Sequence, residues 1–79
     1  MLIGKFNEKL REYEDAFLAK AYLELQYLDE MGAFPSDGVY FKELARVRQE
    51  LYGIPKDIEG TRKDILDEIA RRWVEKMER

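Results

Sequence analysis

The stretch AFLAKAYLELQYL, residues 16–28, constrains the fold more than any other segment, because ten of its thirteen residues are apolar. At about 100° per residue these side chains cover two opposite sides of a helix instead of one stripe. A chain of 79 residues has few other segments with which to cover both sides. We therefore expect one side to pack within the chain and the other to meet a second chain.

Helical periodicity without any β pattern extends along the sequence, which predicts an all-α protein. The helices are expected over about residues 3–31, 37–52 and 61–78. The chain is short enough to form one domain, residues 1–79. The predicted fold is a three-helix antiparallel bundle whose long first helix also forms a dimer.

Glycine and capping residues set the expected helix ends. Gly32 and Gly53, which precede Pro35 and Pro55 by three and two residues, predict left-handed C-caps for the first two helices. Ser36 or Asp37 is available as the N-cap of the second helix, and Thr61 with Asp64 matches the capping-box pattern at the start of the third.

The third helix shows one apolar stripe and one charged side. The stripe is expected to face the core and consists of Ile65, Leu66, Ile69, Ala70, Trp73 and Met77. The opposite side is expected to face solvent and consists of Asp64, Asp67, Glu68, Arg71, Arg72 and Glu75. The aromatic residues Phe6, Tyr13, Phe17, Tyr22 and Phe41 are likewise assigned to the core.

The second apolar side of the first helix is the candidate partner interface. It consists of Ala16, Ala19, Leu23 and Tyr27, with Lys20 and Glu24 at its rim. The small alanines would let a partner helix approach closely, and twofold dimers are the commonest closed assembly. The alternative is that the second and third helices wrap this segment from both sides.

Composition excludes several kinds of chemistry. The chain has no cysteine and no histidine, so disulfides, structural zinc sites and histidine-based nucleophilic catalysis are excluded. Charged residues make up 39% of the chain, whereas Ser, Thr, Asn and Gln together number five. This pattern is typical of hyperthermophile proteins, although an ordinary helical protein can also show it.

Two other functions remain as alternatives. A helical nucleic-acid-binding domain would use Lys42, Arg46, Arg71 and Arg72, but the net charge of −3 and the interspersed glutamates disfavour it. The connection between the second and third helices is also too long for a helix-turn-helix. A carboxylate-metal enzyme would use the groups Glu8, Glu12 and Asp15 or Asp64, Asp67 and Glu68, which lie among lysines and arginines and are more typical of solvated faces.

The sequence therefore favours a small non-catalytic protein–protein interaction module, either a self-associating scaffold or a regulatory subunit. Its expected partner is a second copy of the chain, another protein, or both. No catalytic residue, metal ligand, cofactor or small-molecule ligand is implied. Without a secretory signal or a long uncharged apolar run, the expected location is the cytoplasm and no membrane contact is expected.

Overall fold

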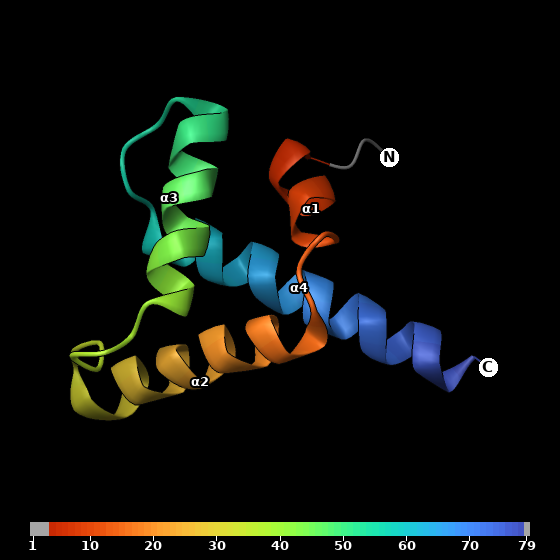
Figure 1. Ribbon diagram of the computed structural model, residues 1–79, viewed down its shortest axis with the longest axis horizontal. Helices are drawn as coiled ribbons and strands as arrows, with labels where there is room; N and C mark the ends of the chain where they lie inside the picture. Colours follow the sequence, from red (N-terminus) through yellow and green to blue (C-terminus); the bar gives the residue numbers. More distant parts are fainter. Residues whose placement is uncertain (1–3, 79) are drawn as a thin grey trace.

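The computed structural model describes residues 4–78, and this part of the chain forms four helices and no strand. The helices are α1 (Lys5–Leu10), α2 (Asp15–Met31), α3 (Tyr40–Tyr52) and α4 (Ile58–Met77). The prediction of an all-α fold is confirmed. The predicted three-helix antiparallel bundle is wrong, because α2 and α4 lie along the molecule whereas α1 and α3 stand across them (Figure 1).

The single long helix predicted over residues 3–31 is also wrong, because a turn separates α1 from α2. The backbone N–H groups of Arg11, Glu12 and Tyr13 donate to carbonyl oxygens three residues earlier, at 3.2, 3.0 and 3.1 Å. This tighter i→i+3 pattern is how α-helices often end. Residue 3, the predicted start, lies outside the described residues.

The turn between α1 and α2 is held by an arginine from the opposite end of the chain. Nη2 of Arg72 donates to the carbonyl oxygen of Leu10 at 3.0 Å and to that of Tyr13 at 2.7 Å. Carbonyls at a helix C-terminus lack partners within the helix, so these donors stabilise the break. As a consequence α1 turns away from the axis of α2, and Phe6 and Leu10 enter the core.

The predicted glycine C-caps are confirmed for both α2 and α3. Gly32 has φ 78° and Gly53 has φ 62°, which lie in the left-handed region that residues with a Cβ rarely adopt. The N–H of Gly32 donates to the carbonyl of Leu28 at 2.8 Å, and that of Gly53 to the carbonyl of Gln49 at 2.9 Å. Both helices therefore end where the sequence indicated.

The start of α4 differs from the predicted one. Asp57 is the N-cap, and its Oδ1 accepts a hydrogen bond from the N–H of Gly60 at 3.0 Å. Thr61 lies within the helix, where its hydroxyl donates to the carbonyl of Asp57 at 2.6 Å. The predicted capping box at Thr61 is therefore wrong, and α4 is the longest helix of the described chain, with 20 residues.

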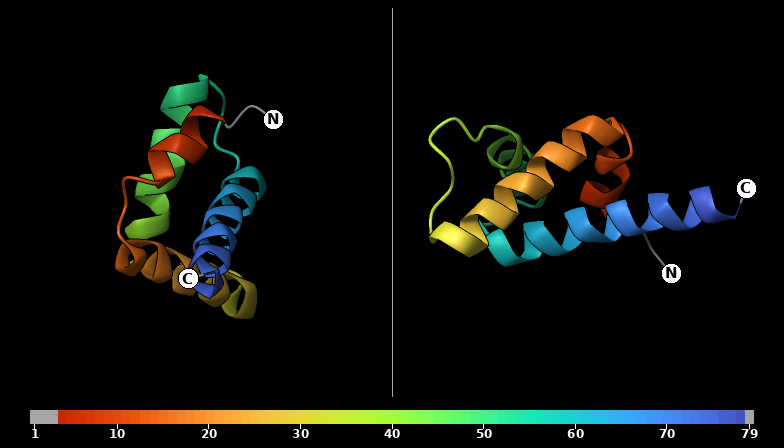
Figure 2. Two further views of the ribbon diagram at one scale, coloured as in Figure 1. Left: turned by 90° about the vertical axis from the view of Figure 1, so that its right-hand side faces the viewer. Right: turned by 90° about the horizontal axis from the view of Figure 1, so that it is seen from below.

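The core lies where α3 packs on α2 and α4, and α1 closes it by packing on α3 and α4 (Figure 2). All four helices contribute side chains to it, and the large buried ones include two phenylalanines. The buried apolar residues are Phe6, Leu10, Leu18, Ala21, Leu25, Phe41, Leu44, Ala45 and Ile65. Helix α3 packs on the inner sides of α2 and α4, and α1 packs on α3 and α4, so the outer sides of α2 and α4 have no cover from the described chain.

Candidate interaction surface

Helix α2 has a buried inner side and an apolar outer side. Leu18, Ala21 and Leu25 are almost fully buried in the core, whereas Leu23 is 60% and Tyr27 41% exposed. The two groups lie on opposite sides of one helix because successive residues are turned by about 100°. The described part of the chain therefore covers one of the two apolar sides and leaves the other open to solvent.

Five of the six residues predicted as a partner interface lie on this outer side. Ala16, Ala19 and Lys20 are exposed together with Leu23 and Tyr27. The ammonium group of Lys20 donates to the hydroxyl of Tyr40 at 3.2 Å and lies 5.0 Å from the centre of that ring. Lys20 is thus placed at the edge where α2 meets α3.

The prediction that places Glu24 at the rim of the interface is wrong. Its side chain points inward, it is only 8% exposed, and its two carboxylate oxygens accept from the N–H groups of Tyr40 at 3.2 Å and Phe41 at 2.9 Å. These N–H groups belong to the first turn of α3, where no partner exists within the helix. Glu24 therefore caps α3 from a neighbouring helix, in place of the predicted Ser36 or Asp37.

Several residues of α4 that the sequence assigns to the core face outward, so these assignments are wrong. Trp73 is 65% exposed and Met77 69%, and Ala70 is also exposed. Only Ile65 of the predicted stripe is buried, while Leu66 and Ile69 are half-buried. The C-terminal end of α4 extends beyond the start of α2, so no helix covers it there (Figures 1 and 2).

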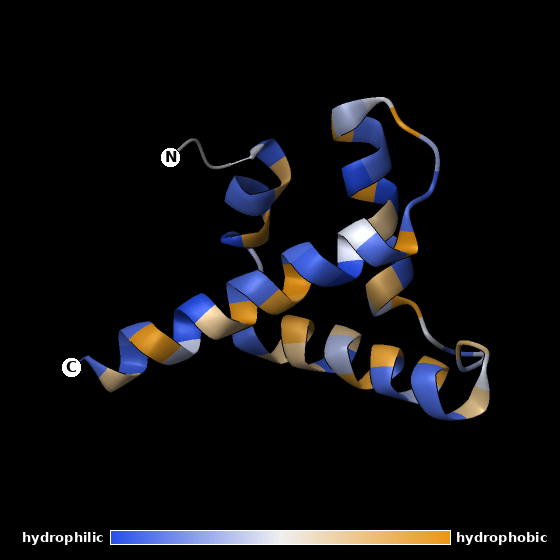
Figure 3. Cartoon of the chain, turned by 180° about the vertical axis from the view of Figure 1, so that it is seen from behind, coloured by the Kyte–Doolittle hydropathy of each residue, from blue (hydrophilic) through white to orange (hydrophobic). Residues whose placement is uncertain are grey.

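A groove of about 220 Å³ separates α2 from the second half of α4. Its walls come from these two helices alone, and apolar side chains form most of the lining. The lining residues are Asp15, Leu18, Ala19, Tyr22, Ile69, Arg72, Trp73 and Lys76. The groove lies between Ala19 on the outer side of α2 and Trp73 in the exposed stripe of α4, and Figure 3 shows that apolar residues recur along both helices. We call the surface formed by Ala16, Ala19, Tyr22, Leu23, Tyr27, Ala70, Trp73 and Met77 the outer α2–α4 face.

Ion pairs close one end of the groove. Asp15 accepts from Nη1 of Arg72 at 2.8 Å and from Nζ of Lys76 at 2.9 Å. The hydrogen bond from Lys76 and then that from Arg72 lower the pKa of Asp15 below its ordinary value of 3.8. The carboxylate therefore stays charged down to a more acidic pH than that of a free aspartate, and it links α2 to α4.

The prediction that places Glu68 on the solvated side of α4 is wrong. It is 3% exposed and accepts from Nη1 of Arg71 at 3.0 Å and from Nε of Arg72 at 2.8 Å. A carboxylate at this depth needs charged partners, because burying an unpaired charge is costly. Arg72 thus binds Glu68, Asp15 and the turn between α1 and α2 at the same time.

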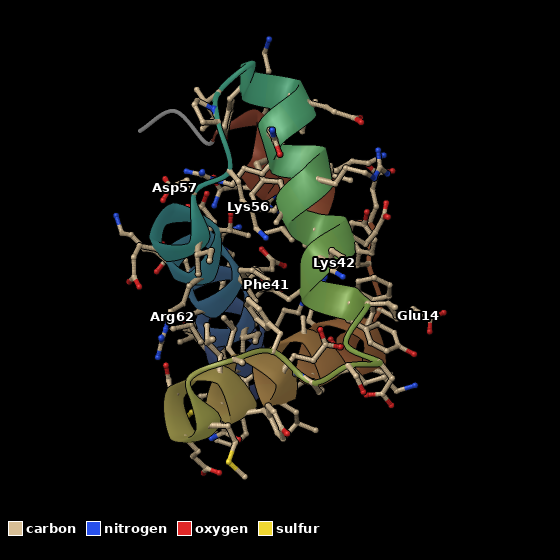
Figure 4. All side chains as sticks on the ribbon, turned by 90° about the vertical axis from the view of Figure 1, so that its left-hand side faces the viewer. Glu14, Phe41, Lys42, Lys56, Asp57 and Arg62 are labelled. Carbon is tan, nitrogen blue, oxygen red and sulfur yellow. The ribbon has the colours of Figure 1, made fainter. Side chains whose placement is uncertain are left out.

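Three of the four residues considered for nucleic-acid binding are engaged by carboxylates. Arg46 pairs with Glu43 and, at 2.7 Å, with Glu50, while Arg71 and Arg72 bind Glu68. Lys42 is exposed on the outer side of α3, next to the buried Phe41 (Figure 4). It lines a shallow depression with residues that include Arg46, Gln49 and Lys56. The four basic residues therefore lie on two helices, with Lys42 and Arg46 on α3 and Arg71 and Arg72 on α4.

The carboxylates considered for metal binding are mostly paired with basic side chains. Asp64 accepts from Nε of Arg48 at 2.9 Å, and Glu12 lies 3.5 Å from Nζ of Lys9. Over residues 4–78, no group of three or more carboxylates is arranged to hold a metal ion. No helix in the same range is long and apolar enough to cross a membrane.

Comparison of the chain with known proteins found no matching family model, no matching curated protein and no matching solved structure. We therefore infer function from the residues and contacts described above.

Proposed function

We propose that this chain is a small non-catalytic protein–protein interaction module that associates with itself through the outer side of α2. The observation that carries this proposal is the exposure of Leu23 and Tyr27 opposite a buried inner side. Contiguous apolar surface of this kind is characteristic of interaction sites on proteins. Ala16 and Ala19 lie on the same side, where their small side chains permit close helix–helix approach.

The size of the domain supports the same proposal. A domain of this length buries only about 60% of the surface of its unfolded chain, so its own core provides limited stability. Disulfides are absent because the chain has no cysteine. Association with a second copy is a common way in which small domains gain further buried area.

The buried polar groups support a structural role rather than a catalytic one. Among the described residues, no buried side-chain nitrogen or oxygen lacks a hydrogen-bond partner. Glu24 caps α3, and Glu68 and Arg72 bind each other. Paired groups of this kind are the usual state of buried polar side chains in a folded protein.

Two matched leucine variants test the proposal. Leu23→Lys places a charge in the outer side of α2, and Leu51→Lys places the same charge at a leucine of α3 that is 39% exposed. Size-exclusion chromatography with light scattering should give a dimer for the wild type and for Leu51→Lys, and a monomer for Leu23→Lys. Disruption of a central apolar side chain typically weakens association by about tenfold or more.

The result that contradicts the proposal is equal behaviour of the two variants. If Leu23→Lys and Leu51→Lys are both dimeric, the outer side of α2 is not the interface. If the wild type is monomeric throughout the micromolar range, self-association itself is wrong. Circular dichroism of each variant checks that the helices are retained.

A further inference from the structure

The exposed residues of α4 have the spacing of a helix–helix seam. Leu66, Ala70, Trp73 and Met77 follow one another at intervals of four, three and four residues, which is the a/d spacing of coiled coils. Leu66 is half-buried, and the other three are exposed. Three of its residues, Ala70, Trp73 and Met77, belong to the outer α2–α4 face, and Trp73 lines the groove together with Ala19.

We propose that a second copy of this chain covers this seam, with the two α4 helices antiparallel about a twofold axis that passes between residues 71 and 72. This inference rests on the self-association proposed above and names the surface and register of the dimer. In this register Ala70 of each copy lies opposite Trp73 of the other. Leu66 of each copy likewise lies opposite Met77 of the other.

The sizes of the side chains favour the antiparallel register over a parallel one. A seam packs well when large side chains lie opposite small ones, as Trp73 and Ala70 would in the antiparallel pair. In a parallel pair Trp73 would lie opposite Trp73 of the second copy, and Ala70 would lie opposite Ala70. That arrangement would crowd one layer and leave a void at the next, and both defects destabilise packing.

The exposed apolar area of this region reaches the lower limit for a specific interface. The exposed parts of Tyr22, Leu23, Trp73, Val74 and Met77 amount to roughly 500 Å² in one copy. If all of these side chains were fully covered, two copies would bury on the order of 1,000 Å², which is the lower limit for a specific interface. A surface that matches itself under a twofold rotation is also what an isologous dimer requires.

The native tryptophan provides the first test. Trp73 is the only tryptophan of the chain, so its fluorescence reports on this site without an added probe. The emission of the wild-type protein is measured over a concentration series in parallel with sedimentation equilibrium. We expect the emission to shift to shorter wavelength, and to become protected from a soluble quencher, at the concentrations at which the dimer forms.

The two measurements separate this inference from the proposed function. A dimer whose Trp73 emission does not change would overturn the α4 seam while leaving self-association through α2 intact. A monomer at every concentration would overturn both.

A pair of alanine variants provides the second test. Ala70→Glu places a charge at the centre of the seam, and Ala33→Glu places the same charge at an exposed position in the connection between α2 and α3. We expect Ala70→Glu to raise the dimer dissociation constant by about tenfold or more. Ala33→Glu should leave it unchanged. Equal dissociation constants for the two variants would overturn the proposed register, and the wild-type fluorescence test stands even if a variant does not fold.

Discussion

The two halves of α4 belong to one helix but have opposite environments. In the first half Thr61 and Ile65, and at the middle of the helix Glu68, are buried beneath the other helices, although two of the three are polar. In the second half Trp73, Val74 and Met77 are half or more exposed, although all three are apolar. The difference shows that the position of the neighbouring helices, and not hydropathy alone, determines which side chains of α4 are buried.

The largest expected effect distinguishes the two halves directly. Ile65→Ala should destabilise the fold by about 3–4 kcal/mol, because it removes a fully buried side chain and leaves a cavity. Val74→Ala in the exposed half should change the free energy of unfolding by less than about 0.5 kcal/mol. Urea denaturation of both variants at low protein concentration measures the two values. Equal losses would mean that the two halves do not differ as described.

The next effect concerns the arginine between the two halves. Arg72→Ala should destabilise the fold by about 3 kcal/mol, because Glu68 loses one charged partner inside the protein and the carbonyls of Leu10 and Tyr13 each lose the hydrogen bond from Arg72. Arg46→Ala is the control, because its ion pairs are exposed and should contribute less than about 1 kcal/mol. Comparable losses in the two variants, again in urea, would show that Arg72 does not hold the turn.

A smaller effect is expected at the cap of α3. Glu24→Ala should cost about 2 kcal/mol, because two N–H groups at the start of α3 lose their acceptor. Glu30→Ala, at an exposed position of the same helix, should be close to neutral. Thermal unfolding followed by circular dichroism compares the two. Should Glu24→Ala unfold at the wild-type temperature, the cap would make no contribution.

The smallest effect is a dependence on pH. The pKa of Asp15 is lowered in the folded protein by hydrogen bonds from Lys76 and Arg72. A carboxyl whose pKa is lower when folded stabilises the protein above its unfolded pKa, near 3.8, and loses that contribution as the pH falls through its folded pKa. Asp15→Asn should therefore melt slightly below the wild type at neutral pH and equally at strongly acidic pH. A difference that persists unchanged in acid would contradict this role.

The sequence predicts the features that depend on neighbouring residues. The all-α class follows from the spacing of apolar side chains. The ends of α2 and α3 follow from Gly32 and Gly53, whose left-handed backbone is a local property. The outer side of α2 can be found from the sequence because one helical period places Leu23 and Tyr27 opposite Leu18 and Leu25.

The features that the sequence does not predict depend on contacts between distant residues. No glycine or proline marks the turn after Leu10, and the donor that stabilises it lies 62 residues further along the chain. Glu24 resembles a surface residue until α3 places two free N–H groups beside it. Trp73 fits an apolar stripe, and its exposure of 65% depends on where the other helices pack against α4, which the local pattern does not specify.

The central claim is that a second copy covers the outer α2–α4 face, and sedimentation equilibrium of the wild-type protein tests it most directly. We expect a mass that rises with concentration from the 9.4 kDa of one chain toward twice that value in the micromolar range. A mass that stays at one chain over that range would contradict the claim.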